Sequence, residues 1–136
     1  KSPLLGLGPS HYYYYTEHIP ILGWYVKFCS HNQYVDLVAQ HGFLGLAAFC
    51  WLALELTLTA LCLRTRLTAG FANSYVIGTL AAIGGTLVSG MLCDWIIPFY
   101  YNIGILGFRS SLLFWFFLGG VLALKRMVLD EPSVPT

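Results

Sequence analysis

The sequence predicts an all-α integral membrane protein with about three transmembrane helices, preceded by an extracytoplasmic loop that contains a short interfacial helix. Of its 136 residues, 57% are hydrophobic and only 10% are charged, which is unusual for a soluble domain. The hydrophobic residues occur in uninterrupted runs long enough to cross a bilayer, and Lys and Arg cluster beside two of these runs. A net charge of +1 offers no basic surface, so no nucleic-acid partner is expected.

Residues 1–41 are predicted to lie outside the cytoplasm as a loop and an interfacial helix. Gly6, Gly8 and Pro9 mark the loop, since glycine and proline favour turns. Four consecutive tyrosines follow at residues 12–15. Tyrosine gathers at lipid headgroups, which is the preferred interpretation here. Stacking on sugar rings is the alternative.

The first predicted span is residues 42–63, about 22 residues, which at 1.5 Å per residue crosses a hydrocarbon core of about 30 Å. Glu55 is its single charged residue. A carboxylate inside a membrane is costly, so we expect it to be neutral, paired or facing a wet cavity. Arg64 and Arg66 follow the span and mark its cytoplasmic end.

The second predicted span, residues 74–92, contains no charged residue. An acidic and aromatic segment with Pro98 follows it and is predicted to be an interfacial loop on the opposite side. Small residues recur at every fourth position of the span in two rows: Gly78, Ala82, Thr86 and Gly90, and Ala81, Gly85 and Ser89. Such rows let helices approach closely in lipid, so we expect this helix to lie centrally in a bundle.

The third predicted span is residues 105–124, which completes a three-helix transmembrane region over residues 42–126. Arg109 lies near the outer end of this span, where a long side chain can reach the interface. Lys125 and Arg126 close the span on the cytoplasmic side. The polar, proline-containing segment 127–136 is predicted to be a loose cytoplasmic tail.

A polar segment leads directly into the first span. If residues 31–41 are helical, Asn32, Asp36 and Gln40 recur every four residues and form one polar stripe. A polar stripe at a membrane surface needs a polar partner. Water, another helix and a substrate all satisfy that need, and helix geometry does not choose among them.

The residues of this segment resemble a known family. His31-Asn32-Gln33-Tyr34, followed by Gly42-Phe43-Leu44-Gly45, is similar to the His-Asn-x-Tyr signature and Gly-Leu-Leu-Gly-type segment of O-antigen ligase and O-antigen polymerase-like membrane proteins. The Gly-x-Gly segment in residues 3–9 and the Phe/Trp-rich stretch ending in Gly119-Gly120 add to the resemblance. It covers nearly the whole chain but only the C-terminal part of the family's usual length, so we expect the chain to be a fragment.

The resemblance implies a glycosyltransferase of the bacterial inner (plasma) membrane that acts on cell-envelope polysaccharide. Such an enzyme moves a glycan from an undecaprenyl-diphosphate-linked donor to an acceptor hydroxyl, with no cofactor and no metal. His31 matches the family's essential histidine and is the expected catalytic base. Asn32, Tyr34, Asp36 and Arg109 are the expected substrate-binding residues, and Asn32 can also orient His31 or cap the helix. The family's donor-binding arginines belong to earlier segments and have no counterpart here.

Two alternatives stay open at this stage. His41 lies one turn into a membrane helix and is either a structural hydrogen-bond donor or an axial ligand of a tetrapyrrole. The whole chain is alternatively a non-catalytic structural subunit, derived from the same family, of a respiratory or photosynthetic membrane assembly. Its partners are then membrane lipids and other transmembrane helices of the same or partner chains. The cysteines form no Cys-x-x-Cys pair, which argues against a metal site.

The three spans predict a defined topology, because Arg64, Arg66, Lys125 and Arg126 share the cytoplasmic side only if the chain crosses an odd number of times after its N-terminal loop. In intact cells, we expect an impermeant thiol reagent to label a single cysteine placed in the loop and to leave a cysteine tag after Thr136 unlabelled. Labelling of the C-terminal tag without permeabilisation would overturn this topology.

Overall fold

The protein is described here by a computed structural model that covers residues 2–9, 11, 14–18, 20, 22–25, 30–97 and 100–130. Within these residues the chain forms the 3-10 helix η2 (Thr16–His18) and the α-helices α1 (Gln33–Arg64), α2 (Phe71–Ser89) and α3 (Tyr100–Asp130). The described residues form no β-strand. Each α-helix contains a stretch long and apolar enough to cross a membrane. The all-α prediction with three spanning helices is therefore confirmed.

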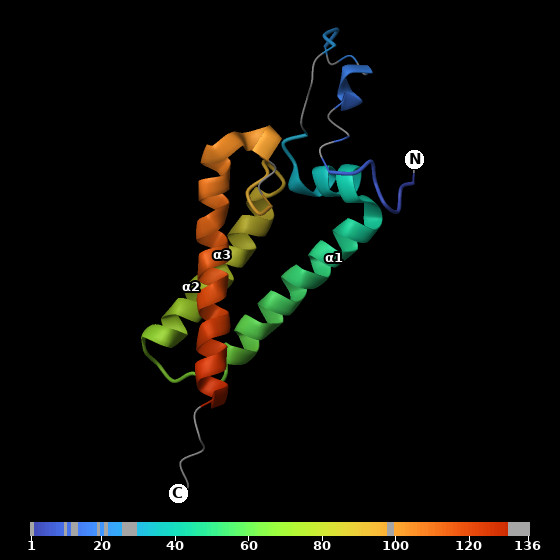
Figure 1. Ribbon diagram of the computed structural model, residues 1–136. Coiled ribbons are helices and arrows are strands. Elements are labelled where there is room, and N and C mark those ends of the chain that lie inside the picture. Colours follow the sequence, from blue (N-terminus) through green and yellow to red (C-terminus); the bar gives the residue numbers. More distant parts are fainter. Residues whose placement is uncertain are drawn as a thin grey trace, which may run out of the picture.

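The three helices run between two ends of the molecule (Figure 1). One end holds the N-terminal segment, the start of α1, the α2–α3 connection and the start of α3, and the opposite end holds the α1–α2 connection and the end of α3. Two clusters of buried side chains join the helices, one around Leu37, Phe49 and Ile96 and one around Ala60 and Val76. Large apolar side chains elsewhere on the helices are exposed, as lipid-facing side chains are.

Helix α1 is broken at Gly42. This residue has φ 67° and ψ −170°, far from helical values, and only glycine adopts that conformation readily. The break divides α1 into a short first segment, residues 33–41, and a long second segment, residues 43–64. Figure 1 shows the first segment lying across the direction of the second. The first span predicted from the sequence starts at this break.

The N-terminal segment crosses α1 at the break and supplies its missing hydrogen bonds. A break in a helix leaves amide and carbonyl groups without partners, which is costly away from water. Four backbone hydrogen bonds replace them: Phe43 N to Pro3 O (3.0 Å), Leu44 N to Leu4 O (3.2 Å), Leu7 N to Ala39 O (2.9 Å) and Gly8 N to Gln40 O (2.9 Å). The crossing therefore holds the two segments of α1 at a fixed angle.

Glycine is required on both segments, the N-terminal segment and α1, where they cross. A Cβ atom on Gly42 would overlap the carbonyl group of Leu4, and a Cβ atom on Gly6 would lie 2.5 Å from the carbonyl carbon of Gln40. Gly6 also has a positive φ of 71°. Close backbone contact with α1 thus explains Gly6, whereas glycine at position 8 is favoured by a positive φ of 95°.

The ends of α2 and α3 differ from the predicted span limits. Helix α2 ends at Ser89, three residues before the predicted end, because Gly90 to Cys93 turn back with hydrogen bonds to the last carbonyls of the helix. Helix α3 begins at Tyr100 and continues to Asp130, so residues 127–130 are helical where a loose tail was predicted. The rest of that tail, residues 131–136, and the predicted interfacial residues Tyr12, Tyr13 and Pro98 lie outside the described residues.

The crossing predicts a strong effect of one methyl group. We expect Gly42→Ala to lower the free energy of unfolding by roughly 2 to 4 kcal/mol, because it combines an unfavourable backbone conformation with overlap against Leu4. Gly84→Ala is the matched control, since no atom lies within 4 Å of its added Cβ, and a helical alanine is favoured by up to about 1 kcal/mol. Unfolding of both purified variants in detergent, compared with the parent, gives the measurement. Equal stability of the two variants would contradict the assigned role of Gly42.

Candidate functional site

The His-Asn pair lies at the start of α1. Asn32 is the N-cap residue, with extended backbone angles, and its side-chain oxygen accepts hydrogen bonds from the amides of Tyr34 (3.0 Å) and Val35 (3.1 Å). Such a cap satisfies amides that a helix start otherwise leaves unpaired. His31 immediately precedes the cap, is exposed, and has a positive φ of 50°. A non-glycine residue with positive φ is uncommon and often marks a functional position.

Asn32 and Tyr34 also fasten α1 to the end of α2. The Asn32 amide group donates to the carbonyl oxygen of Met91 (3.1 Å), and the Tyr34 hydroxyl donates to the carbonyl oxygen of Leu87 (2.5 Å). These carbonyls belong to the last turn of α2 and the residues after it, which a helix end leaves partly unpaired. Both predicted substrate-binding residues therefore have structural hydrogen bonds within the chain.

Asp36 is fully buried one turn into α1. Its carboxyl group accepts a hydrogen bond of 2.5 Å from the Ser30 hydroxyl, and the same hydroxyl oxygen accepts from the Asn32 amide N–H at 3.1 Å. Ser30, the residue before His31, is thus tied to α1 through Asp36. Asp36 has no exposed surface in this structure, and its role as a substrate-binding residue stays a prediction.

Gln33 is the residue at this site that the sequence interpretation missed. It is fully buried, and its side-chain oxygen accepts hydrogen bonds from the amides of Ile96 (3.2 Å) and Ile97 (3.0 Å). The backbone N–H of Gln33 donates to the carbonyl oxygen of Gly90 (2.8 Å). The buried polar face consists of Gln33, Asp36 and Gln40, a spacing of three and four residues that is as helical as the predicted stripe.

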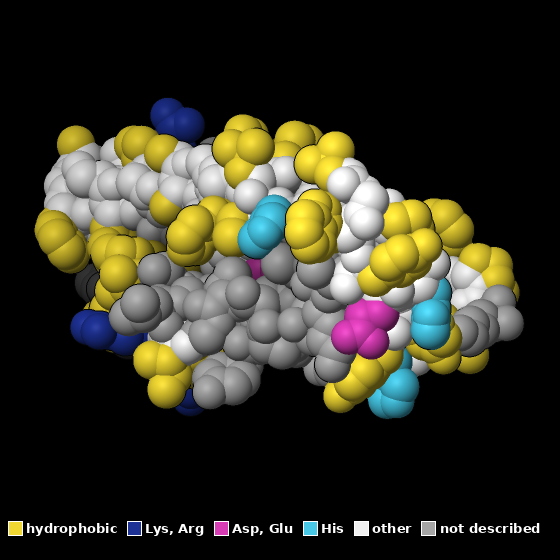
Figure 2. Space-filling view, turned by 90° about the horizontal axis from the view of Figure 1, so that it is seen from above, with side chains coloured by type: hydrophobic (Ala, Val, Ile, Leu, Met, Phe, Trp, Pro, Cys, Tyr) yellow, Lys and Arg dark blue, Asp and Glu magenta, His cyan; other side chains and the backbone are white. Residues whose placement is uncertain are grey.

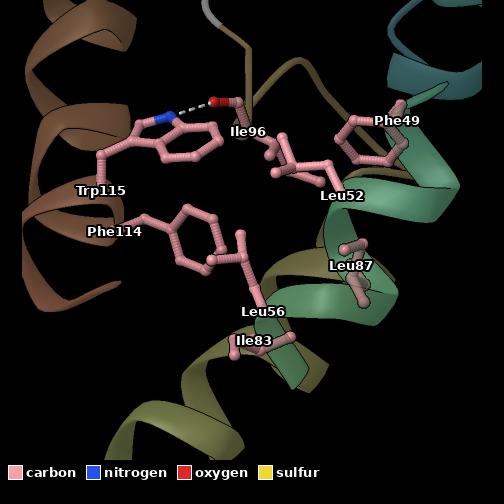
Figure 3. Close-up of a pocket in the computed structure, with 9 residues that line it drawn as sticks. Phe49, Leu52, Leu56, Ile83, Leu87, Ile96, Phe114 and Trp115 are labelled. Atoms are coloured by element: carbon pink, nitrogen blue, oxygen red, sulfur yellow. Dashed lines mark hydrogen bonds between the residues drawn. The ribbon is translucent and has the colours of Figure 1, made fainter. Parts of the chain in front are cut away.

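Helix α3 holds the other side of the α2–α3 connection. The Ser111 hydroxyl donates to the carbonyl oxygen of Trp95 (2.7 Å), and the Trp115 indole donates to that of Ile96 (2.9 Å). Figure 3 shows the second of these bonds as a dashed line. Side chains from α1 and α3 thus pair with two amides and two carbonyls of a segment that forms no regular structure. This arrangement fixes the connection beside the start of α1.

A small apolar cavity lies beside the α2–α3 connection, next to Ile96. Side chains from all three helices and Ile96 line it, as Figure 3 shows: Phe49, Leu52 and Leu56 from α1, Ile83 and Leu87 from α2, and Phe114 and Trp115 from α3. Its volume of about 20 Å³ is near that of one water molecule, and an apolar cavity of this size stays dry.

The other predicted site residues lie at the same end. Arg109 is exposed on α3, two residues before Ser111. His41 is half-buried beside the break, and its side chain packs so closely on Gly45 that a Cβ atom there would overlap it. Figure 2 views this end and shows hydrophobic and histidine side chains sharing its surface. The roles of Arg109 as a substrate-binding residue and of His41 as a tetrapyrrole ligand stay predictions.

The chemistry available at the start of α1 is that of the exposed His31 imidazole, which directly precedes the N-cap residue Asn32. Imidazole exchanges a proton near neutral pH and can act as a general base. In the part of the chain that the structure describes, no three His, Cys, Asp or Glu side chains come together in a way that could hold a metal ion.

Comparisons with protein families, curated proteins and solved structures find no match to this chain.

The Gln33 side chain accepts hydrogen bonds from two amides of the α2–α3 connection, so we expect its removal to have a large effect. We expect Gln33→Leu, which has a similar volume, to lower the free energy of unfolding by roughly 2 to 4 kcal/mol, because it leaves the amides of Ile96 and Ile97 without an acceptor. Hydrogen exchange at these two amides should become faster. Val35→Leu is the control, on the exposed side of the same turn. Unchanged exchange at both amides in Gln33→Leu would show that the side chain does not hold the connection.

Proposed function

We propose that this chain is the C-terminal part of an O-antigen ligase-like glycosyltransferase of the bacterial inner membrane. The observation that carries the proposal is the placement of His31. Its imidazole is exposed and lies directly before the capped start of α1, at the end of the molecule that holds the N-terminal segment. A lipid-linked donor presents its sugar at such a boundary, where the lipid stays in the bilayer and the acceptor arrives from water. The resemblance of the His-Asn-x-Tyr segment to that family supports the same reaction.

In the proposed reaction, His31 is the general base. A ring nitrogen of neutral His31 takes the proton of an acceptor hydroxyl while the acceptor oxygen forms a bond to the anomeric carbon of the donor sugar. The bond between that carbon and the diphosphate oxygen breaks, and the electron pair leaves with the lipid diphosphate. The protonated imidazole then releases its proton to water. Transfer of this kind needs no oxidant, reductant or metal.

Arg109 is the proposed contact for the leaving diphosphate. It is exposed on α3 at the same end as His31, and a guanidinium group binds phosphate oxygens well. Asn32, Tyr34 and Asp36 contribute by positioning His31 and the first segment of α1, since their hydrogen bonds lie within the chain. Further cations from segments preceding this one complete the donor site in this proposal.

The orientation is part of the proposal. Arg66 and Lys125 line one cavity at the end opposite His31, and basic residues at span ends favour the cytoplasm. The N-terminal segment and His31 then face the outside, which is where an envelope glycan is assembled.

A second candidate function is that of a non-catalytic subunit in a larger membrane assembly. The supporting observation is on α2, where no atom from another segment of the chain lies within 4 Å of a Cβ added at Gly78, Gly84 or Gly85. Small residues exposed on a membrane helix favour close contact with another helix. The sequence predicted these rows to pack inside a bundle, and within this chain the Gly78 and Gly85 positions stay uncovered.

The proposed base predicts a selective loss of activity. In the complete protein that contains this chain, purified in lipid, we expect His31→Ala to lower glycan transfer by roughly 10² to 10⁴-fold, which is the usual contribution of a general base. The melting temperature should stay close to that of the parent because His31 is exposed. His18→Ala is the control, since His18 is also exposed but lies in η2, away from α1.

Two outcomes of this experiment would overturn the assignment. Full transfer by a folded His31→Ala protein would exclude His31 as the base. Absence of transfer by the parent protein, with normal assembly of a membrane complex by both proteins, would favour the subunit function.

A further inference from the structure

A second cavity, with a mixed polar and apolar lining, lies at the end of the molecule opposite His31. It has a volume of about 220 Å³ and is formed between the C-terminal part of α1, the residue after its cap, and α3. Arg66 and Lys125 line it together with the Thr59 hydroxyl-bearing side chain, and Leu63 and Val128 supply apolar surface. Among the residues that the structure describes, none that lines this cavity is acidic.

The end of a helix explains the position of Arg66 beside this cavity but not that of Lys125. Arg66 follows the C-cap residue Thr65 of α1, where the negative end of a helix attracts a cation. Lys125 lies five residues before the end of α3 at Asp130, beyond the last turn over which that attraction acts. Two positive charges beside one cavity repel each other at the low-dielectric edge of a membrane, so an anion between them would stabilise the arrangement.

The position and lining of the cavity define the chemistry of that anion. The cavity lies where two spanning helices end, which is the level of lipid headgroups. Its cations suit a phosphate, and its apolar residues suit acyl-chain carbon atoms. Its volume is below the roughly 300–1,000 Å³ of sites that enclose a whole drug-sized ligand, which fits a headgroup whose chains stay in the bilayer.

We propose that this cavity binds the phosphate headgroup of an anionic phospholipid from the leaflet at the C-terminal end of the molecule. Arg66 and Lys125 contact the phosphate from opposite walls, and Leu63 and Val128 contact the first carbon atoms of the chains. This lipid site is separate from the proposed transfer site at His31 and stands whether or not the chain is a transferase. Free phosphate shares the charge but lacks the apolar part.

The test measures retention of phosphatidylglycerol and of phosphatidylcholine by the purified chain in detergent, using native mass spectrometry. We expect the parent to retain phosphatidylglycerol preferentially. Arg66→Gln with Lys125→Gln should lower its apparent affinity roughly 10- to 30-fold, as expected for loss of two cations at a membrane surface. Arg64→Gln with Arg126→Gln is the matched control, because it removes the same charge from exposed neighbours that do not line the cavity.

Several outcomes decide the proposal. Retained binding in the control pair and in the charge-conserving pair Arg66→Lys with Lys125→Arg, each with an unchanged melting temperature, supports it. An equal loss in both glutamine pairs would show a general attraction between basic ends and anionic lipid, and would overturn the cavity site. Equal retention of phosphatidylcholine, or displacement of the lipid by millimolar inorganic phosphate, would overturn the lipid assignment.

Discussion

The crossing of the N-terminal segment over the break in α1 is the constraint on which the rest of this end of the molecule depends. Backbone groups at the edge of a membrane must find partners in the protein, and Gly42 removes the helical partners of its neighbours. Four hydrogen bonds from residues 3–8 replace them. The first segment of α1 is thereby held at its angle, and this segment carries both His31 at its start and Gln33 on its buried face.

The same requirement shapes the α2–α3 connection. Residues 94–97 form no helix or strand, yet two of their amides and two of their carbonyls are paired by the side chains of Gln33, Ser111 and Trp115. Polar side chains from two spanning helices therefore provide hydrogen bonds that backbone groups provide in a helix or sheet. The connection in turn provides Ile96, which packs against Leu37 and Phe49, so polar and apolar contacts at this end support each other.

The two ends of the molecule differ in chemical character. The end with the N-terminal segment buries two carboxyl groups, Asp36 and Asp94, and exposes the His31 imidazole. The opposite end presents cations around a half-apolar cavity. This polarity suits a protein that reacts with a polar substrate on one side of the membrane and binds anionic lipid on the other, which is the combined content of the two proposals.

The sequence by itself determined the fold class and the number of spans, because a bilayer demands long apolar helices and tolerates little else. It also located the polar segment before the first span and offered a cap as one role for Asn32. It did not identify Gln33, because the partners of Gln33 are backbone amides more than sixty residues away. The angle between the two segments of α1 at Gly42 and the placement of Arg66 and Lys125 beside one cavity were likewise decided by tertiary structure. Each depends on segments that are distant in the chain and adjacent only after packing.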